Sequence, residues 1–261
     1  MGELKYLLKF GKREHLESLT KGTLFCSNAI TFWGIEKDLK VKGQGVILEA
    51  GSKIFSQRML AQEIGTDKIA LYNVPMQALV HYEPAEKIPV YCMFAITEGD
   101  CIIDDNGNYH IKLLEATKET IKNHFPNADS VAIVKKPYKF LDEIKNSINC
   151  RIEHDFVHYF NIDNGYTDEN VELAKMDMEY MQYLTQDVPP IVEDGKKTYR
   201  FLADYVYRAL LCKDIFFKNE QEYRIVLPDE QIEESTDFKV NITEKIDIIS
   251  LSDFWICDQL P

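Results

Sequence analysis

The segment FFKNEQEYRIVLP, residues 216–228, decides the fold that this sequence predicts. Its pattern is typical of a β-strand, because successive strand side chains point to opposite faces of a sheet. Such a strand places Glu220, Glu222 and Arg224 on one face and mostly apolar residues on the other. The charged row predicts either a solvent-facing strand edge with an internal ion pair or a site for acid–base chemistry or ribose recognition.

The beginning of the chain predicts a compact unit of two strands and a helix. Residues 5–10, KYLLKF, form the first strand, and residues 12–21 form a short helix that Gly22 terminates. A second strand follows over residues 23–27. The order of this unit is therefore strand, short helix, glycine, strand.

The middle of the chain mixes strands with helices. Residues 89–97, PVYCMFAIT, are apolar on both faces, which predicts a central strand. The turn sequence DDNGN at residues 104–108 predicts a β-hairpin. The other predicted elements are helices over residues 56–64, 117–125, 137–148, 169–184 and 199–211, and strands over residues 45–49, 70–74, 130–134, 151–161 and 246–252.

These elements predict an α+β fold, organised as a single domain over residues 1–261 with a mixed, mainly antiparallel sheet and flanking helices. The hydrophobic content of 45% is sufficient for a proper core. Residues 28–55 are expected to form a long loop or a lid, because loops of this length in a compact domain are often functional. Residues 163–198 are expected to form a helical insertion.

The composition restricts the partners and the location of the protein. The formal net charge of −13 argues against a strong nucleic-acid-binding surface, which usually needs a basic face. The six cysteines include no CxxC pair, which is typical of reduced thiols. No apolar run reaches the roughly 18 residues that a membrane span needs. We therefore expect a cytoplasmic protein without a membrane partner.

Two histidines raise the question of a metal site. His154 and His158 are four residues apart and have acidic neighbours. On a helix they would face the same way and could bind a metal ion, but their segment predicts a strand and no HExxH motif is present. We therefore predict no metal site. The absence of GxGxxG and GxxxxGK[ST] motifs also argues against a Rossmann or P-loop nucleotide site.

Three segments of the chain form a recognisable set: LLKFGKREHLESLTKGTLFCS at residues 7–27, ADSVAIVKKPYKFLDEIKNSI at residues 128–148, and FFKNEQEYRIVL at residues 216–227. They resemble the "hLesLl-G-l-f-s" opening, the middle strand and helix, and the terminal "F-x-x-E-x-E-x-R" strand of a large family of uncharacterised bacterial proteins. Members of that family are common near mobile elements and defence genes. The resemblance implies a toxin or phage-defence setting.

The initial strand, short helix and glycine and the later sequence Glu220-Gln221-Glu222 form a second pattern. It resembles ADP-ribosyltransferases, including the toxin branch that modifies nucleic acids, whose last strand carries the catalytic glutamate. The resemblance implies NAD as the substrate. It also implies that Glu222 stabilises the ribosyl cation and that Glu220 activates the acceptor.

The same resemblance implies a set of NAD-binding residues. Positive charge gathers over residues 9–15, against the acidic average of the chain, and this cluster would hold the pyrophosphate. An exposed helix position is the alternative for His15. The implied NAD-binding residues are Lys9, Phe10, His15, Ser27, Phe32 and Arg224.

The sequence is compatible with three classes of function. The first is an ADP-ribosyltransferase-like enzyme that transfers ADP-ribose from NAD to a macromolecule in a toxin or phage-defence setting. The second is a non-enzymatic binding or sensor protein that recognises a phage protein or a nucleotide. The third is a metal-dependent nuclease that uses Glu220, Glu222 and an Asp or a His. The expected partners are a macromolecular target or a phage component, with an antitoxin or a second copy of the chain as further candidates.

Overall fold

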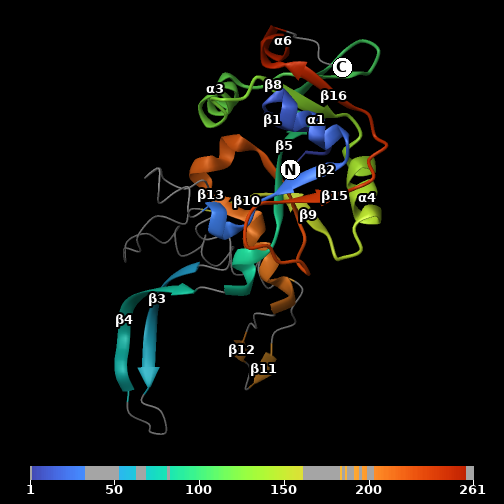
Figure 1. The fold of residues 1–261 in the computed structure, drawn as a ribbon. Coiled ribbons are helices and arrows are strands. Elements are labelled where there is room, and N and C mark those ends of the chain that lie inside the picture. Colours follow the sequence, from blue (N-terminus) through green and yellow to red (C-terminus); the bar gives the residue numbers. More distant parts are fainter. Residues whose placement is uncertain are drawn as a thin grey trace. The chain divides into compact units, whose positions relative to one another are not determined.

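The computed structural model describes residues 2–32, 53–62, 69–80, 83–160, 183, 186, 191–193, 196–198 and 203–256 (Figure 1). The chain forms two compact units, each assembled from separate segments. Unit 1 consists of Met1–Asn28, Ile88–Val157 and Phe217–Pro261, and unit 2 consists of Ala29–Lys87 and His158–Phe216. The predicted loop over residues 28–55 and the predicted insertion over residues 163–198 fall almost entirely within unit 2, and most of their residues lie outside the described ranges.

A six-stranded sheet forms the centre of unit 1 (Figure 1). All five pairings between neighbouring strands are antiparallel. The apolar segment over residues 89–97 provides β5, which lies between β1 and β14, so the predicted central strand is confirmed. The strand order is β16 (Ile246–Ser250), β8 (Ser130–Val134), β1 (Leu4–Gly11), β5 (Val90–Thr97), β14 (Glu222–Val226) and β9 (Glu153–Phe156).

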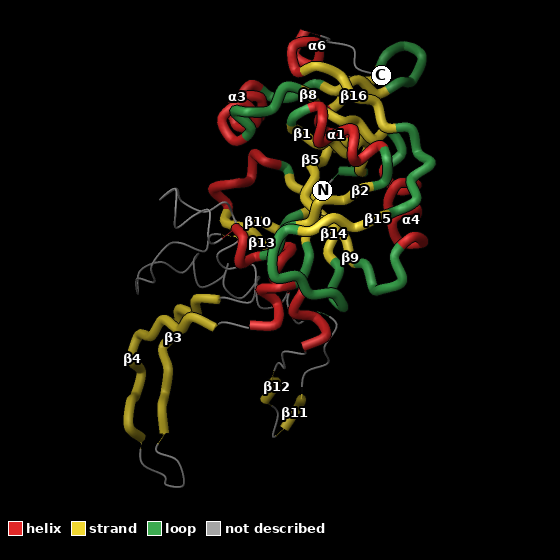
Figure 2. Tube along the Cα trace, in the orientation of Figure 1, coloured by secondary structure: helices red, strands yellow, loops and turns green. Residues whose placement is uncertain are grey.

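Helices cover both faces of this sheet (Figure 2). They are α1 (Arg13–Thr20), α3 (Glu115–His124), α4 (Pro137–Ser147) and α6 (Leu251–Ile256). On one face, Leu16 of α1 and Phe140 of α4 pack in a core with Ile225 of β14. On the other face, Ile121 of α3 and Phe254 of α6 pack in a second core. The antiparallel sheet with flanking helices confirms the predicted α+β class.

Smaller strand pairs complete the described structure. In unit 1, β2 (Thr23–Cys26) pairs with β15 (Thr236–Lys239), and β6 (Cys101–Ile103) pairs with β7 (Tyr109–Ile111). The pair β6–β7 is the hairpin that the sequence DDNGN predicts, so that prediction is confirmed. In unit 2 the pairs are β3 (Lys53–Gln62) with β4 (Ile69–Val80), β10 (His158–Phe160) with β13 (Cys212–Asp214), and β11 (Ile191–Glu193) with β12 (Lys196–Thr198).

Four short 3-10 helices are also described. They are η1 (Glu83–Lys87), η2 (Glu98–Asp100), η3 (Ala203–Leu211) and η4 (Ile215–Glu220).

The structure corrects two predicted elements outside β14. The predicted helix over residues 56–64 is wrong, because the described part of this segment lies in β3 and pairs with β4. Its Gln, Arg, Met, Leu and Ala residues favour a helix locally, and cross-strand pairing overrides that propensity. The predicted strand over residues 151–161 is two strands, β9 and β10, which belong to different units.

Other expectations concern the parts of the chain that the structure leaves undescribed. The predicted strand over residues 45–49 lies outside the described residues, as does the predicted helix over residues 169–184 apart from Tyr183. Within the described ranges, no helix is both long enough and apolar enough to cross a membrane.

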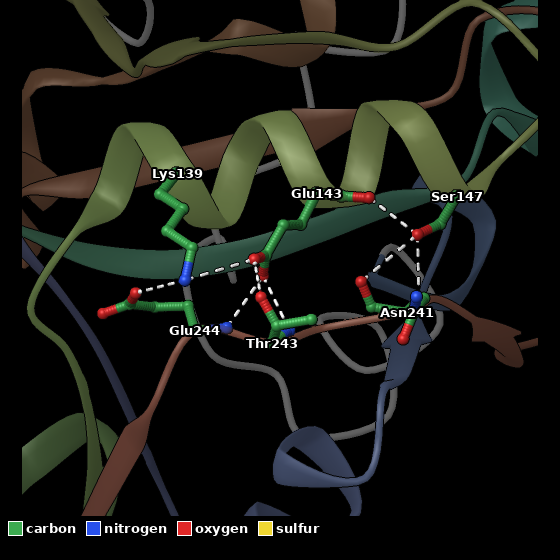
Figure 3. A network of polar contacts seen from close by, with 6 residues as sticks. All are labelled: Lys139, Glu143, Ser147, Asn241, Thr243 and Glu244. Atoms are coloured by element: carbon green, nitrogen blue, oxygen red, sulfur yellow. Dashed lines mark hydrogen bonds and ion pairs between the residues drawn. The ribbon is translucent and has the colours of Figure 1, made fainter.

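Helix α4 holds the connection between β15 and β16 through one carboxylate (Figure 3). Glu143 accepts hydrogen bonds from the backbone N–H groups of Thr243 and Glu244, each at 2.9 Å, and from the Thr243 hydroxyl. Lys139 forms ion pairs with Glu143 at 3.4 Å and with Glu244 at 3.2 Å. The otherwise irregular connection is thereby fixed to the helix that packs on the sheet.

Replacing Glu143 with glutamine is expected to lower the melting temperature at neutral pH and to have no effect at strongly acid pH. Burial raises the pKa of Glu143, but hydrogen bonds from Thr243 and from the backbone of Glu244 outweigh it and lower the pKa from 4.5 to about 2. The carboxylate therefore stabilises the fold fully above the pKa of the unfolded chain, and this contribution is lost as the pH falls from 4.5 toward 2. Melting curves of both proteins across this range measure the difference.

The matched control is Glu119→Gln, which removes an exposed glutamate of α3. We expect the melting temperature of this variant to equal that of the wild type at every pH. A melting-temperature difference for Glu143→Gln that stays constant down to the most acid condition would contradict the assignment.

Candidate functional site

The turn that leads into β14 separates the two glutamates of the predicted charged row. Residues Ile215–Glu220 form the 3-10 helix η4, and Gln221 has a φ of 43°, in the left-handed region that non-glycine residues rarely adopt. The strand begins only at Glu222. The prediction that Glu220 lies in one strand row with Glu222 and Arg224 is therefore wrong, because the helix and the left-handed residue interrupt the strand alternation.

Hydrogen bonds hold Gln221 in this conformation. Its carbonyl oxygen accepts from the N–H of Ala95 at 2.7 Å, and its Nε2 donates to Oδ1 of Asp100 at 2.8 Å. The Asp100 carboxylate also accepts from the hydroxyl of Thr97 at 2.7 Å, which fixes its position. A non-glycine residue that its surroundings hold in a sparsely populated conformation is a feature of many functional sites. The turn therefore fixes the direction of the residues on either side of it.

Glu220 pairs with a histidine from a distant part of the chain. Its Oε1 contacts Nδ1 of His124, the last residue of α3. The Glu220 side chain is 16% exposed and the His124 side chain is 35% exposed, so the carboxylate is mostly enclosed while part of the ring reaches solvent. The ring of Phe217 lies beside the imidazole, with the centroids 6.3 Å apart. Because an ionised carboxylate only accepts hydrogen bonds, Nδ1 carries the hydrogen, and in a neutral ring Nε2 carries the lone pair.

Glu222 pairs with Arg224 within β14. Its Oε2 accepts a hydrogen bond from Nη2 of Arg224 at 3.0 Å, and the two side chains are only 11% and 1% exposed. Residues that lie opposite each other in an antiparallel pair point to the same face of the sheet. Arg224 lies opposite Cys92 of β5 on one side and Asp155 of β9 on the other. The buried guanidinium therefore has two carboxylates as neighbours on its face of the sheet.

Cys92 contributes a neutral group to this row. Burial, followed by the negative charge of Glu222, raises the pKa of the Cys92 thiol to about 12. The thiol also forms a hydrogen bond with the Glu222 carboxylate. It is therefore protonated at neutral pH and does not act as a thiolate nucleophile. The group in this row that is suited to chemistry is the carboxylate of Glu222.

The two carboxylate pairs border the same region of unit 1. Glu222 lies opposite Phe94, whose ring packs in the same core as Ile121 of α3. Glu222 therefore points to the face of the sheet that α3 covers, and His124 ends that helix. The two glutamates are only two residues apart, so their backbone positions are separated by at most about 7 Å.

Lys9 lies on the opposite face of the sheet from Glu222, because Leu7 and Tyr91 beside it belong to the core under α1, whereas Leu8 and Phe94 belong to the core under α3. Its Nζ donates to the carbonyl oxygen of Cys92 at 2.6 Å and lies 4.7 Å from the centroid of the Tyr91 ring. Strand β1 pairs with β5 only as far as Leu8, opposite Phe94. Lys9 therefore follows the last paired position of β1 and bonds the backbone of β5 from the face that α1 covers, away from the Glu222 carboxylate.

The other residues implied for NAD binding lie elsewhere. Phe10 is buried in the core among three phenylalanine rings. The side chain of His15 is 75% exposed on α1, which covers the opposite face of the sheet. Ser27 Oγ lies 2.9 Å from Ser235 Oγ, and Phe32 belongs to unit 2. Of the implied set, the structure brings Arg224 into contact with Glu222, whereas Lys9 bonds β5 from the opposite face of the sheet.

The two histidines that raise the question of a metal do not form one site in unit 1. His154 Nδ1 lies 2.8 Å from the hydroxyl of Tyr223, and burial lowers the pKa of His154. His158 belongs to unit 2. In the part of the chain that the structure describes, no group of three or more His, Cys, Asp and Glu side chains is arranged to hold a metal ion.

Sequence reasoning missed three residues of this region: His124, Cys92 and Asp155. His124 is 96 residues from Glu220 in the chain, and it lies in an ordinary amphipathic helix. Cys92 and Asp155 meet Arg224 through strand pairing, which the sequence does not specify. The only available signal was the apolar segment over residues 89–97, which predicts a strand next to the centre of the sheet.

Comparison of the chain with protein-family models, with curated proteins and with solved structures gave no match. The geometry of the two carboxylate pairs is therefore the basis on which we infer a function.

Proposed function

We propose that the chain is an ADP-ribosyltransferase-like enzyme that cleaves NAD between nicotinamide and ribose and transfers the ADP-ribose to a macromolecule. Glu222 is the catalytic carboxylate of this reaction, and Arg224 positions it. The proposal assigns chemistry to residues of unit 1 alone.

The buried ion pair of Glu222 and Arg224 carries this proposal. When the bond between ribose C1′ and the nicotinamide nitrogen breaks, positive charge develops on C1′ and on the ring oxygen of the ribose. A carboxylate that is already fixed in place stabilises such charge, because it does not have to reorganise during the reaction. Arg224, which is 1% exposed, holds the Glu222 carboxylate in one orientation at 3.0 Å. Glu222 retains some exposure and is the less enclosed member of the pair.

The biological setting is part of the same proposal. The resemblance of the two ends of the chain to a family found near mobile elements and defence genes supports a role as a toxin or in phage defence. Such a role implies a cytoplasmic enzyme, and the five cysteines that the structure describes are all free thiols, as is usual in a reducing compartment. The macromolecular acceptor is then a component of the host or of the phage, and an antitoxin is a natural partner.

Nicotinamide release from NAD by the purified protein tests the proposal, both alone and with cell lysate as a source of acceptor. Glu222→Gln is expected to lower the rate by about 10²–10³-fold, the usual effect of removing one electrostatic stabiliser. Glutamine has nearly the same shape as glutamate, and its amide oxygen still accepts the hydrogen bond from Arg224. The variant is therefore expected to fold, which its melting curve verifies.

The matched control is Glu244→Gln, which neutralises another enclosed carboxylate of unit 1. The Glu244 side chain is 6% exposed and pairs with Lys139 at 3.2 Å, so the substitution resembles Glu222→Gln in burial and in the loss of an ion pair. We expect this variant to consume NAD at the wild-type rate. A wild-type protein that releases no nicotinamide under either condition would contradict the proposal and would favour a binding or sensor protein.

A further inference from the structure

We propose that His124, oriented by Glu220, is the general base that removes the proton from the acceptor. This inference rests on the proposed function, because it assigns the second half of the same transfer reaction. Its basis is the contact between Glu220 Oε1 and His124 Nδ1 at the start of β14. The resemblance to ADP-ribosyltransferases implies that Glu220 itself activates the acceptor, but the Glu220 carboxylate is in contact with the His124 imidazole.

The pairing prepares His124 for proton transfer. A carboxylate at Nδ1 selects the tautomer in which Nε2 accepts, and it stabilises the imidazolium that forms when Nε2 takes a proton. Glu220 is 16% exposed, whereas the His124 ring is 35% exposed, so the orienting group is enclosed and the reactive group remains accessible. Among the described residues, the structure records no hydrogen bond at Nε2, so this nitrogen is available to an acceptor.

The His124–Glu220 pair is positioned for a reaction at the same ribose whose developing positive charge Glu222 stabilises. Both groups lie on the α3 face of the sheet, and the backbone positions of Glu220 and Glu222 are at most about 7 Å apart. The left-handed Gln221 between them directs one carboxylate to α3 while the other pairs along β14. One short segment thus supplies the group that stabilises the ribosyl cation and the group that orients the base.

A lone pair of the acceptor oxygen or nitrogen forms a bond with C1′ of the ribose, and the bond between C1′ and the pyridinium nitrogen breaks. The electron pair of that bond passes to the ring nitrogen, so nicotinamide leaves as a neutral molecule. The acceptor proton passes to Nε2 of His124, which takes up the positive charge that the pyridinium ring loses.

Two variants test the step in the nicotinamide-release assay. His124→Ala removes the base and is expected to lower the rate by about 10²-fold or more, the usual contribution of a general base. Glu220→Gln leaves the imidazole without its orienting carboxylate and is expected to have a smaller effect, of about 10-fold or more. The matched control is His110→Ala. His110 also pairs with a carboxylate, that of Asp104 at 3.0 Å, but elsewhere in unit 1, so this substitution is expected to leave the rate of nicotinamide release unchanged.

Azide distinguishes a base from a structural histidine. Azide is an anionic nucleophile that needs no proton removal, so it is expected to restore nicotinamide release in His124→Ala with formation of an ADP-ribosyl azide. It is not expected to restore release in Glu222→Gln, which lacks the cation-stabilising carboxylate. Full activity of His124→Ala, or a loss that azide does not reverse, overturns this inference and leaves the role of Glu222 intact. A wild-type protein without NAD cleavage overturns both assignments.

Discussion

Replacing Gly22 with alanine is expected to lower the free energy of unfolding by about 3–5 kcal/mol, at the upper end of the effects of single substitutions. Gly22 ends α1 with a φ of 76°, and a Cβ built on it would lie 2.0 Å from the carbonyl oxygen of Val240. The backbone on both sides is fixed, because Gly22 accepts a hydrogen bond from the N–H of Val240 at 2.8 Å. Relief of the overlap requires this bond to break where β2 and β15 meet. Chemical denaturation of wild type and variant measures the loss.

Gly107→Ala separates the backbone conformation from the close approach. Gly107 has a φ of 83°, but a Cβ at this position meets no atom within 4 Å. Gly107→Ala is therefore expected to lower the free energy of unfolding only by the strain of a non-glycine residue in the left-handed region, about 1–2 kcal/mol. Equal losses of unfolding free energy in Gly22→Ala and Gly107→Ala would show that the close approach of Val240 does not cause the destabilisation of Gly22→Ala.

Replacing Arg224 with leucine is expected to lower the free energy of unfolding by about 3–5 kcal/mol, because it leaves a largely buried carboxylate without its cation. The Arg224 side chain is 1% exposed and that of its partner Glu222 is 11% exposed. Asp155, opposite Arg224 on β9, also loses the positive charge on its face of the sheet. Equilibrium denaturation measures the loss. The same variant is expected to lose NAD cleavage, because Glu222 is no longer held in place.

The double variant Arg224→Leu with Glu222→Leu tests whether the charge is responsible. Replacing both members of a buried ion pair with apolar residues is often neutral, whereas removing one member is strongly destabilising. We therefore expect the double variant to be more stable than Arg224→Leu alone. A double variant with the summed loss of both single variants would show that packing, and not the unpaired charge, dominates.

Local sequence patterns were sufficient for several elements. Residues 130–134 and 137–148 became β8 and α4 almost to the residue, because one is a short apolar run and the other has a single apolar face. The turn residues DDNGN specified the β6–β7 hairpin, in which the Asp104 carboxylate accepts from the N–H groups of Asn106 and Asn108. In each case the determining interactions lie within a few residues of one another in the chain.

Local patterns failed where distant partners decide the conformation. The predicted strand begins at residue 216, but residues 215–220 form η4, and Gln221 is held in the left-handed region by Ala95 and Asp100, more than 100 residues away. Residues 56–64 have the composition of a helix, but they pair with β4. No propensity scale includes partners of this kind, so neither outcome was visible in the sequence.

The sequence by itself determined the α+β class, the central place of β5 and the position of Glu222 and Arg224 on one face of one strand, because apolar periodicity and charge spacing are properties of short segments. Only the tertiary structure decided the partners of these residues. It placed Glu220 against His124, and it placed Arg224 between Cys92 and Asp155. The physical reason is that strand pairing and helix packing join segments about 70 to 130 residues apart, and the energy of a buried charge depends on these neighbours rather than on the adjacent sequence.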